Sequence, residues 1–276
     1  MLSSEILKAI LIGIVEGVTE WLPISSTGHM ILLDEFIHLN VSSTFRELFL
    51  MVVQLGAILA VPILFFDKLN PFSHRKNEAE KKTTLNLWLK VIVGVAPAAV
   101  LGILIDDLCS RYLHNYVVVS IALIIYGIIF ILTEKFSIKI TKRIERAEDL
   151  SYGDALKIGV FQLLSLVPGT SRSGSTIIGG LLIGASRSAS AEFSFFMAIP
   201  IMLGVSALKI LKFVFCGFTA TANEILLLLV GMVVSFLVSY RSIKFLLDFV
   251  KRRNFKPFGI YRILLGTLVL LYFITK

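Results

Sequence analysis

Six long apolar segments dominate this sequence and limit the folds that it can adopt. They cover residues 48–66, 87–105, 116–132, 193–215, 224–238 and 259–274. Segments of this kind are read as helices that cross a bilayer, and the last one, which is short, can do so if the side chains at its ends snorkel. With 56% hydrophobic and 17% charged residues, the composition excludes an ordinary soluble domain. We predict an all-α polytopic membrane protein that forms a single domain over residues 1–276.

Two further apolar segments, residues 6–33 and 154–185, carry polar residues at their centres. In the first, Pro23 is expected to end a helix near Leu22, and the Ser and Thr residues that follow can cap a new helix near His29. We predict that both segments are re-entrant hairpins of two helices, which are stable at membrane depth only where they are buried in protein or line a cavity. Ionisable side chains at that depth mark a functional site.

The positions of Lys and Arg predict how the chain crosses the membrane. Three basic loops, residues 67–86, 135–146 and 241–256, alternate with weakly charged loops near Arg111 and Cys216. The positive-inside rule places the basic loops in the cytoplasm and both termini outside. Three spans then separate the two hairpins, so the hairpins are expected to enter from opposite sides of the membrane.

This odd number of spans implies two inverted repeats, residues 1–133 and 154–276, joined by a basic linker over residues 134–153. A shift of 146 positions supports the repeat by matching five pairs of similar residues: Gly13 with Gly159, Glu16 with Gln162, Ser25 with Ser171, Thr27 with Ser173 and Gly28 with Gly174. Inverted repeats with broken helices place their binding site near the bilayer midplane, between the repeats. We therefore expect the polar centres of the two hairpins to meet.

Charge and cysteine content exclude several classes of function. The net charge of +8 is explained by basic loops held in the cytoplasm, so nucleic acid is not an expected partner. Cys109 and Cys216 are the only cysteines and form no CxxC motif, which excludes metal clusters and redox motifs. Both lie in predicted outer loops, so a disulfide bond between them is an alternative that the sequence leaves open.

Arg172 is the only arginine at the centre of either hairpin. A guanidinium group at membrane depth needs an anionic partner, and its planar fork matches the oxygens of a phosphate group. Hydroxyl and N–H groups at a helix start suit the same ligand, and four neighbours supply them: Gly169, Thr170, Ser171 and Ser173. We therefore expect a phosphate site here. Arg172 can also pair with Glu16 or Glu20 to hold the repeats together, and the two roles are compatible.

Glu16 and Glu20 lie four residues apart and therefore share one face of the first helix. Two carboxylates beside a phosphate repel it unless a cation intervenes. A Mg²⁺ or Ca²⁺ ion bound by both carboxylates and by phosphate oxygens would resolve this conflict. Glu20 is alternatively a general base. Both roles suit a hydrolase, and the sequence alone does not separate them.

The first hairpin also contains the candidate nucleophiles. Ser26 is the first choice, activated by Glu20 or by His29. His29 is the alternative nucleophile, and it is also a candidate for the acid that protonates the leaving group. Further phosphate-binding groups are expected from three polar residues, Ser25, Thr27 and Gln54. For the last of these, which lies in the next apolar segment, an interhelical hydrogen bond is an equal alternative.

The two polar motifs together resemble the bacitracin-resistance family of undecaprenyl-diphosphate phosphatases. The first motif reads EGVTEWLPISSTGH over residues 16–29, and the second reads PGTSRSG over residues 168–174. The family pattern of an acid or Gln, three residues and then Glu is met by Glu16 and Glu20. The pattern Pro-Gly-x-Ser-Arg-Ser-x-x-Thr is met from Pro168 through Thr176. The resemblance extends over essentially the whole chain.

This resemblance implies hydrolysis of undecaprenyl diphosphate to undecaprenyl phosphate and inorganic phosphate, with a divalent cation, Mg²⁺ or Ca²⁺. It implies an enzyme of the bacterial plasma membrane whose active site is reached from the outer side, with roles for Glu16, Glu20, Ser26, His29 and Arg172. The product is the lipid carrier for peptidoglycan and other envelope polymers. Overproduction would therefore confer resistance to bacitracin, which sequesters the diphosphate. Both a monomer and a homodimer are compatible with the sequence.

Two alternative functions lead to different expectations. Type-2 phosphatidic acid phosphatases act on the same lipid, but they carry a His six residues after a Ser-Arg pair, where this sequence has Ile178, so this alternative is excluded. An inverted repeat with a midplane site is also typical of a secondary transporter, here one that would flip an anionic polyprenyl phosphate lipid. Ser26 and His29 favour chemistry over transport, because a carrier needs no nucleophile.

Overall fold

The six long apolar segments form helices in the structure, a computed structural model that describes residues 2–113, 115–137 and 143–276. These helices are long and apolar enough to cross a membrane, α5 over its Glu78–Gly102 part. Their bounds are α3 (Ser43–Leu64), α5 (Glu78–Leu113), α6 (Tyr116–Ser137), α9 (Arg187–Phe215), α10 (Ala222–Arg252) and α11 (Lys256–Thr275). No strand occurs in the described ranges. The chain is an all-α, multi-pass membrane protein, as predicted.

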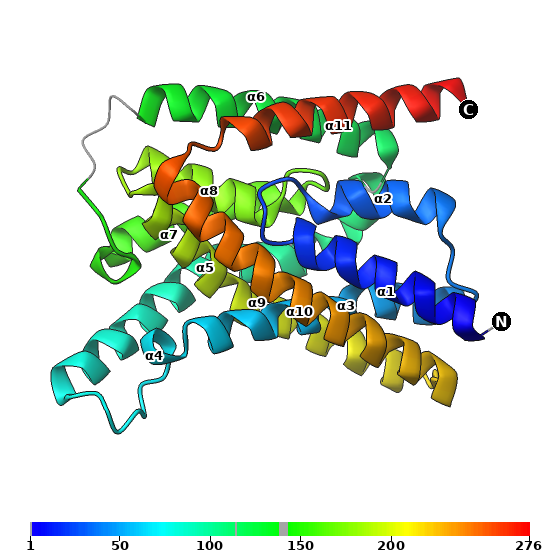
Figure 1. Cartoon of the computed structure of the whole chain (residues 1–276), viewed down its shortest axis with the longest axis horizontal. Coiled ribbons are helices and arrows are strands. Elements are labelled where there is room, and N and C mark those ends of the chain that lie inside the picture. The colour runs from blue at the N-terminus through cyan, green and yellow to red at the C-terminus, as the bar shows by residue number, and fades with distance from the viewer. Residues whose placement is uncertain (1, 114, 138–142) are drawn as a thin grey trace.

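Two pairs of shorter helices form the predicted broken hairpins. The first pair is α1 (Leu2–Thr19) and α2 (Ser26–Phe36). The second is α7 (Tyr152–Gln162), which continues into the 3₁₀ turn η2 (Leu163–Leu166), and α8 (Arg172–Leu182). We call the connecting loops tip 1 (residues 20–25) and tip 2 (residues 167–171). The hairpins enter the bundle from opposite ends, and their tips meet near its centre (Figure 1).

The helix ends of the first hairpin differ from the sequence-based expectation. Helix α1 ends at Thr19 rather than near Leu22, and α2 begins at Ser26 rather than near His29. The Ser25 hydroxyl accepts a hydrogen bond from the Gly28 N–H (3.4 Å), so the cap lies earlier than expected and the helix begins directly after it. Tip 1 is therefore a short irregular turn around Pro23.

Several loop boundaries are also corrected. The sequence predicts a basic link over residues 241–256, but α10 continues to Arg252 because this segment is amphipathic, with Ile243, Leu246 and Val250 buried on one face. Helix α5 likewise begins within the basic loop predicted over residues 67–86 and extends to Leu113. Of the predicted basic loop 135–146, residues 138–142 lie outside the described residues. Both cysteines are free, so they form no disulfide bond.

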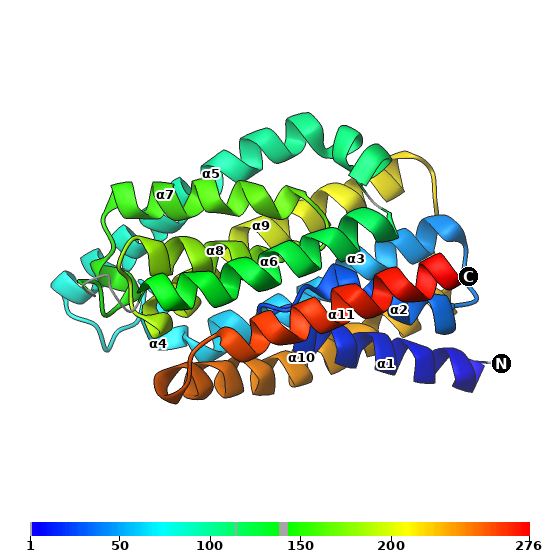
Figure 2. The same cartoon turned by 90° about the horizontal axis from the view of Figure 1, so that it is seen from above.

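Glycines allow neighbouring helices to approach closely. Helices α6 and α11 run side by side in both views (Figures 1 and 2). A Cβ atom added at Gly127 would lie 2.7 Å from the Gly259 carbonyl oxygen, and one added at Gly259 would lie equally close to the Gly127 oxygen. Small residues at a crossing are a usual feature of packed membrane helices. The α6–α11 pair therefore forms a tight unit along one side of the hairpins.

The same packing recurs at matching positions of the two halves. A Cβ atom at Gly13 of α1 would lie 2.7 Å from the Gly231 oxygen of α10, and one at Gly159 of α7 would lie 2.1 Å from the Gly94 oxygen of α5. Gly13 and Gly159 are the residues that the shift of 146 positions aligns. The two contacts are compatible with an inverted repeat, which stays a prediction, as do its boundaries and the orientation of the halves in a membrane.

The largest apolar core contacts tip 1 and is rich in aromatic residues. Trp21 is fully buried and meets the Phe195 ring edge-on, with ring centroids 5.3 Å apart. Phe193 and Phe196, also on α9, belong to the same core. Aromatic rings bury large areas and prefer such edge-to-face contacts. The Trp21 contact therefore anchors tip 1 against α9 and fixes the backbone next to Glu20.

Replacing Gly159 with Ala tests the close packing of α7 on α5. The added methyl group would collide with the Gly94 backbone, and overpacking of this kind costs about 1–3 kcal/mol. We expect Gly159→Ala to lower the midpoint of thermal unfolding in detergent. Gly204→Ala in α9 is the matched control, because no atom lies within 4 Å of its added Cβ, and its midpoint should not fall. Equal midpoints for the two variants would contradict this packing.

Candidate active site

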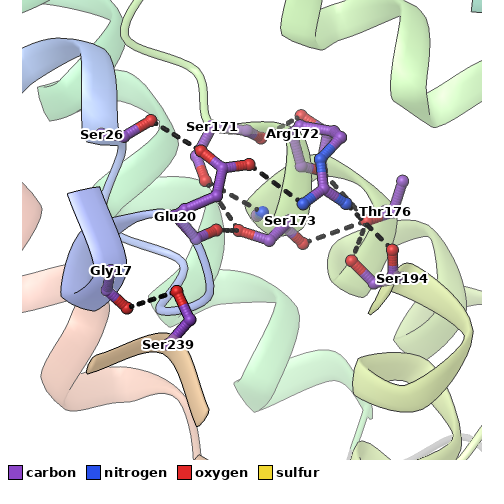
Figure 3. Close-up of polar contacts among 11 residues, drawn as sticks. Gly17, Glu20, Ser26, Ser171, Arg172, Ser173, Thr176, Ser194 and Ser239 are labelled. Carbon is purple, nitrogen blue, oxygen red and sulfur yellow. Dashed lines mark hydrogen bonds and ion pairs between the residues drawn. The ribbon is translucent and has the colours of Figure 1, made fainter. Parts of the chain in front are cut away.

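The carboxylate of Glu20 joins the two hairpins at the centre of a polar cluster (Figure 3). Its Oε2 atom accepts a hydrogen bond from the Ser26 hydroxyl (2.9 Å), and its Oε1 atom forms an ion pair with Arg172 Nη2 (3.1 Å). Only 10% of the Glu20 side chain and 11% of the Arg172 side chain are exposed. Glu20 therefore contacts both Ser26 of its own hairpin and Arg172, which lies 152 positions away in the sequence.

Arg172 is held from several sides and keeps one donor without a partner. Besides the ion pair, its Nη1 atom donates to the Ser194 carbonyl oxygen of α9 (2.9 Å), and its guanidinium lies 5.9 Å from the centre of the Trp21 ring. Its Nε atom is buried and has no hydrogen-bond partner within the described residues. Leaving a buried donor unpaired is costly. This N–H group is therefore available to an anionic ligand.

A second set of contacts holds α8 against tip 1. The Ser173 hydroxyl donates to the Glu20 backbone carbonyl (3.2 Å), and the Ser171 and Ser173 hydroxyl oxygens lie 3.2 Å apart (Figure 3). One turn after Arg172, the Thr176 hydroxyl donates to Ser194 Oγ (2.7 Å). The two serines of the second motif thus lie beside the Glu20–Arg172 pair, as the sequence predicts.

The two tips have the same local structure. Ser25 (φ 72°) and Ser171 (φ 74°) are the two non-glycine residues with positive φ in the described chain. Each is the N-cap of the following helix, with its hydroxyl accepting from the N–H three residues on, at Gly28 (3.4 Å) and Gly174 (3.1 Å). Both α2 and α8 therefore begin at the cluster. Helix N-termini carry partial positive charge and free N–H groups, which suit phosphate.

Glu16 lies one turn before Glu20 and is the natural candidate for a cation ligand. Its side chain is buried, with 1% exposure, and its Oε1 atom has no hydrogen-bond partner within the described residues. No group of three His, Cys, Asp or Glu side chains that could hold a metal occurs in the described part of the chain. A cation bound here would therefore take its remaining ligands from phosphate oxygens and water. The orphaned Glu16 oxygen fits such an ion.

The ring of His29 bonds groups other than the Ser26 hydroxyl. Its Nδ1 atom lies 2.8 Å from the Ser25 carbonyl oxygen, and its Nε2 atom lies 2.7 Å from the Tyr261 hydroxyl of α11. A carbonyl only accepts, so Nδ1 carries the proton and Nε2 accepts from Tyr261. The ring also stacks on Tyr261, at 5.6 Å and 7°. Of the two groups expected to activate Ser26, Glu20 is the one that bonds it in the structure.

The other predicted ligands occupy different environments. Thr170 is fully buried in tip 2, and Gly169 has a φ of +90° with its carbonyl oxygen bonded to Arg262. Thr27 and Gln54 are half-buried. Among the hydrogen bonds of the described residues, none joins either of these two side chains to the Glu20–Arg172 pair. Phosphate binding by these residues stays a prediction.

Sequence reasoning missed three contributors, Ser194, Tyr261 and Arg262. Ser194 contributes through its backbone and hydroxyl, which no motif marks. Arg262 lies inside the apolar segment 259–274, and an ionisable residue within a predicted span is by itself a signal of function. That signal was available in the sequence. The contact of Tyr261 with His29 joins residues 232 positions apart, and no local pattern indicates it.

Fold and site together define a class of protein. It is an integral-membrane protein in which two broken hairpins bring an arginine, two carboxylates and several hydroxyl groups to one largely buried cluster. A model of the family described as bacitracin resistance protein BacA matches residues 9–268. The chain belongs to this family.

Curated relatives are similar over almost their entire length. The undecaprenyl-diphosphatase of Desulfitobacterium hafniense (strain DSM 10664 / DCB-2) is 55% identical over 270 residues, which cover 98% of this chain and 96% of the relative. A protein of the same name from Enterococcus faecalis is 57% identical over 270 residues, covering 97% and 96%. Undecaprenyl-diphosphatase 1 of Clostridioides difficile (strain 630) is 57% identical over 269 residues, covering 98% and 96%.

Two substitutions of Ser171 separate its capping role from its backbone strain. Glycine adopts positive φ without strain and costs only a few tenths of a kcal/mol at an N-cap, whereas alanine keeps the strain and loses the cap, at about 1 kcal/mol. We expect Ser171→Ala to have a lower thermal unfolding midpoint than Ser171→Gly. A midpoint for the alanine variant at or above that of the glycine variant would contradict the assigned φ of 74°.

Proposed function

We propose that this chain hydrolyses undecaprenyl diphosphate to undecaprenyl phosphate and inorganic phosphate. The observation that carries the proposal is the chain of contacts Ser26–Glu20–Arg172, which joins a hydroxyl, a carboxylate and a guanidinium across the two tips. These are the groups that a phosphoryl transfer needs as nucleophile, base and charge stabiliser. The printed names of the relatives support the same substrate and reaction.

In the proposed first step, the Ser26 proton passes to Glu20 Oε2 while Ser26 Oγ bonds to the terminal phosphorus. The bond from that phosphorus to the bridging oxygen breaks, and undecaprenyl phosphate leaves with its electron pair. Water then displaces Ser26 from the phosphorus, Ser26 recovers the proton held by Glu20, and the proton released by the water leaves with the inorganic phosphate. The 2.9 Å Ser26–Glu20 hydrogen bond supports this direction of proton transfer.

The environment of His29 favours Ser26 as the nucleophile. Both ring nitrogens of His29 are engaged, one by the Ser25 carbonyl and one by Tyr261. Reaching a phosphorus atom beside Glu20 would require His29 to break both contacts. A role of His29 as the acid for the leaving group would meet the same obstacle, so we assign His29 instead to holding the start of α2 against α11 through Tyr261.

Arg172 and the starts of α2 and α8 would bind the diphosphate. The unpaired Nε atom of Arg172 and the first N–H groups of both helices supply donors that no helix carbonyl can satisfy. Charge develops on the oxygens of the transferred group, and fixed donors in a water-poor site stabilise it strongly. Ser171 and Ser173 add hydroxyl groups at the same place.

We also propose a divalent cation, Mg²⁺ or Ca²⁺, held by Glu16 and Glu20. The buried Glu16 oxygen without a partner supports it. When bound, such an ion would neutralise the repulsion between carboxylates and diphosphate and polarise the phosphoryl oxygens. Glu20 would then contribute Oε1, which also pairs with Arg172, to the ion, while Oε2 stays with Ser26 as the base.

We propose that the protein lies in the bacterial plasma membrane with its site reached from the outer side, and the arrangement of charge supports the orientation that this requires. Both termini lie at one end of the bundle, and the basic segments 67–86 and 241–256 lie toward the other (Figure 1), as the positive-inside rule requires of an outward-facing N-terminus. Hydrolysis there would regenerate the lipid carrier of envelope polymers and relieve bacitracin. A homodimer is compatible with this placement.

Transport of an anionic polyprenyl phosphate is the second candidate. Two hairpins that enter from opposite ends support it, because this arrangement is typical of carriers. Transport would not require a hydroxyl bonded to a base. The two functions therefore differ in whether a phosphorus–oxygen bond breaks.

Phosphate release from a polyprenyl diphosphate in detergent tests the proposal. We expect the wild type to release phosphate with Mg²⁺ or Ca²⁺ present. Glu20→Ala should lower kcat by about 10²–10⁴-fold through loss of the base, and Arg172→Ala by about 10²–10³-fold through loss of charge stabilisation. Arg143→Ala, which removes a 60% exposed guanidinium from an ion pair with Asp154, is the control and should retain wild-type activity. If the wild type releases no phosphate but moves the monophosphate lipid across a bilayer, the protein is a transporter and the proposed hydrolysis is wrong.

Removal of divalent cations tests the metal proposal separately. We expect EDTA to abolish phosphate release and excess Mg²⁺ or Ca²⁺ to restore it. Glu16→Gln should raise the cation concentration for half-maximal activity at least about tenfold, the smallest loss typical of even an indirect metal partner. Full activity in EDTA would exclude the cation, while the roles of Glu20 and Arg172 would still be tested by the preceding assay.

A further inference from the structure

Arg262 is the most deeply buried charged side chain of α11, with 0% exposure. It lies in the middle of an apolar helix that packs tightly on α6. Within the described residues, no carboxylate forms a salt bridge with it, although a buried cation normally requires a counter-charge. The reaction proposed above leaves Arg262 unused. Its burial therefore calls for a separate explanation.

The guanidinium of Arg262 donates one hydrogen bond to each tip. Its Nη1 atom donates to the Pro23 carbonyl oxygen of tip 1 (3.3 Å), and its Nη2 atom donates to the Gly169 carbonyl oxygen of tip 2 (2.8 Å). Pro23 lies three positions from both Glu20 and Ser26, and Gly169 lies three positions before Arg172. One rigid side chain thus spans the two loops that carry the candidate reacting groups.

The surroundings of Arg262 fix its position. The guanidinium carbon lies 5.9 Å from the centre of the Tyr126 ring and 6.0 Å from that of the Phe130 ring, both on α6. Aromatic faces attract a cation without neutralising it. A Cβ atom at Gly174 would lie 3.3 Å from Nη1, so the start of α8 also borders the group. Arg262 is therefore wedged between α6, α8 and both tips.

We infer that Arg262 is a positioning residue that sets the distance between the two tips, so that Glu20 and Arg172 meet in the reactive arrangement. The planar fork places its two donors on separate nitrogen atoms, whereas the N–H groups of a lysine diverge from a single nitrogen and cannot reproduce that spacing. The retained positive charge also lies near the expected diphosphate. The catalytic part of this inference rests on the proposed phosphatase function, whereas the structural part does not.

Two substitutions and one control variant test the inference. Arg262→Lys keeps the charge but loses the fork, and Arg262→Gln loses both. We expect both to lower kcat about 100-fold, the effect of a misplacement near 1 Å, with KM changing by less than about threefold because ground-state binding groups remain. The lysine variant keeps the test valid if the glutamine variant does not fold. Arg187→Lys is the control, since Arg187 also forms a fork, half-buried and on the buried Glu134 (2.7 and 2.9 Å), away from the tips.

Amide hydrogen exchange supplies a readout that needs no substrate. We expect both Arg262 variants to exchange faster at residues 20–28 and 167–174 while the rest of the chain keeps wild-type protection. Arg187→Lys should leave exchange at the tips unchanged. Wild-type exchange at the tips of an Arg262 variant would overturn the inference, and so would a uniform loss of protection like that of a general stability defect. The two proposals can also fail separately. If the wild type releases no phosphate but the Arg262 variants exchange faster at the tips, the positioning role is supported and only the proposed function is rejected.

Discussion

The structure depends on one constraint: charged and polar groups buried inside a helical bundle must satisfy one another. Two helices are broken in the middle of the bundle, and each break leaves N–H groups, carbonyls and side chains that lipid cannot hydrogen-bond. These groups are satisfied by contacts between the two hairpins. Glu20 accepts from Ser26 within its own hairpin and pairs with Arg172 of the other. The Arg262 fork satisfies one loop carbonyl from each.

The groups that hold the hairpins together are also the groups that the chemistry needs. A buried ion pair adds little net stability, because desolvation offsets most of its attraction, but breaking it exposes an uncompensated charge. A diphosphate between the hairpins would take over part of that pairing with Arg172 and free Glu20 to accept a proton. Among the buried polar atoms that have no hydrogen-bond partner within the described residues, Arg172 Nε and Glu16 Oε1 belong to the charged groups of the proposed site. An anion and a cation together would satisfy both.

Much of this architecture could be predicted from the sequence, because its signals are local. The length of each apolar segment predicts the six spans. Prolines and glycines beside hydroxyl residues predict the break in each hairpin. The shift of 146 positions predicts that Ser25 and Ser171 are equivalent, and their shared φ and capping bear this out. Helix ends were less accurate, since the cap at Ser25 and the amphipathic end of α10 depend on side-chain contacts that hydropathy does not describe.

What the sequence could not provide are contacts between distant helices. The His29–Tyr261 bond and the two bonds of Arg262 join positions that no spacing rule connects. His29 shows the consequence: its place in the motif, three residues after Ser26, suggested that it activates that serine, whereas its ring bonds a tyrosine of α11. Tertiary structure decided which of two plausible bases lies at the hydroxyl.

The central claim is that one phosphate site is built from both hairpins. An experimental structure of the protein with a non-hydrolysable analogue of a prenyl diphosphate would test it most directly. The account predicts the terminal phosphoryl group within hydrogen-bonding distance of both Ser26 and Arg172, with the Ser26–Glu20 contact retained. An analogue bound to one hairpin alone, with Glu20 and Arg172 on separate sides of it and no shared ligand, would contradict the account.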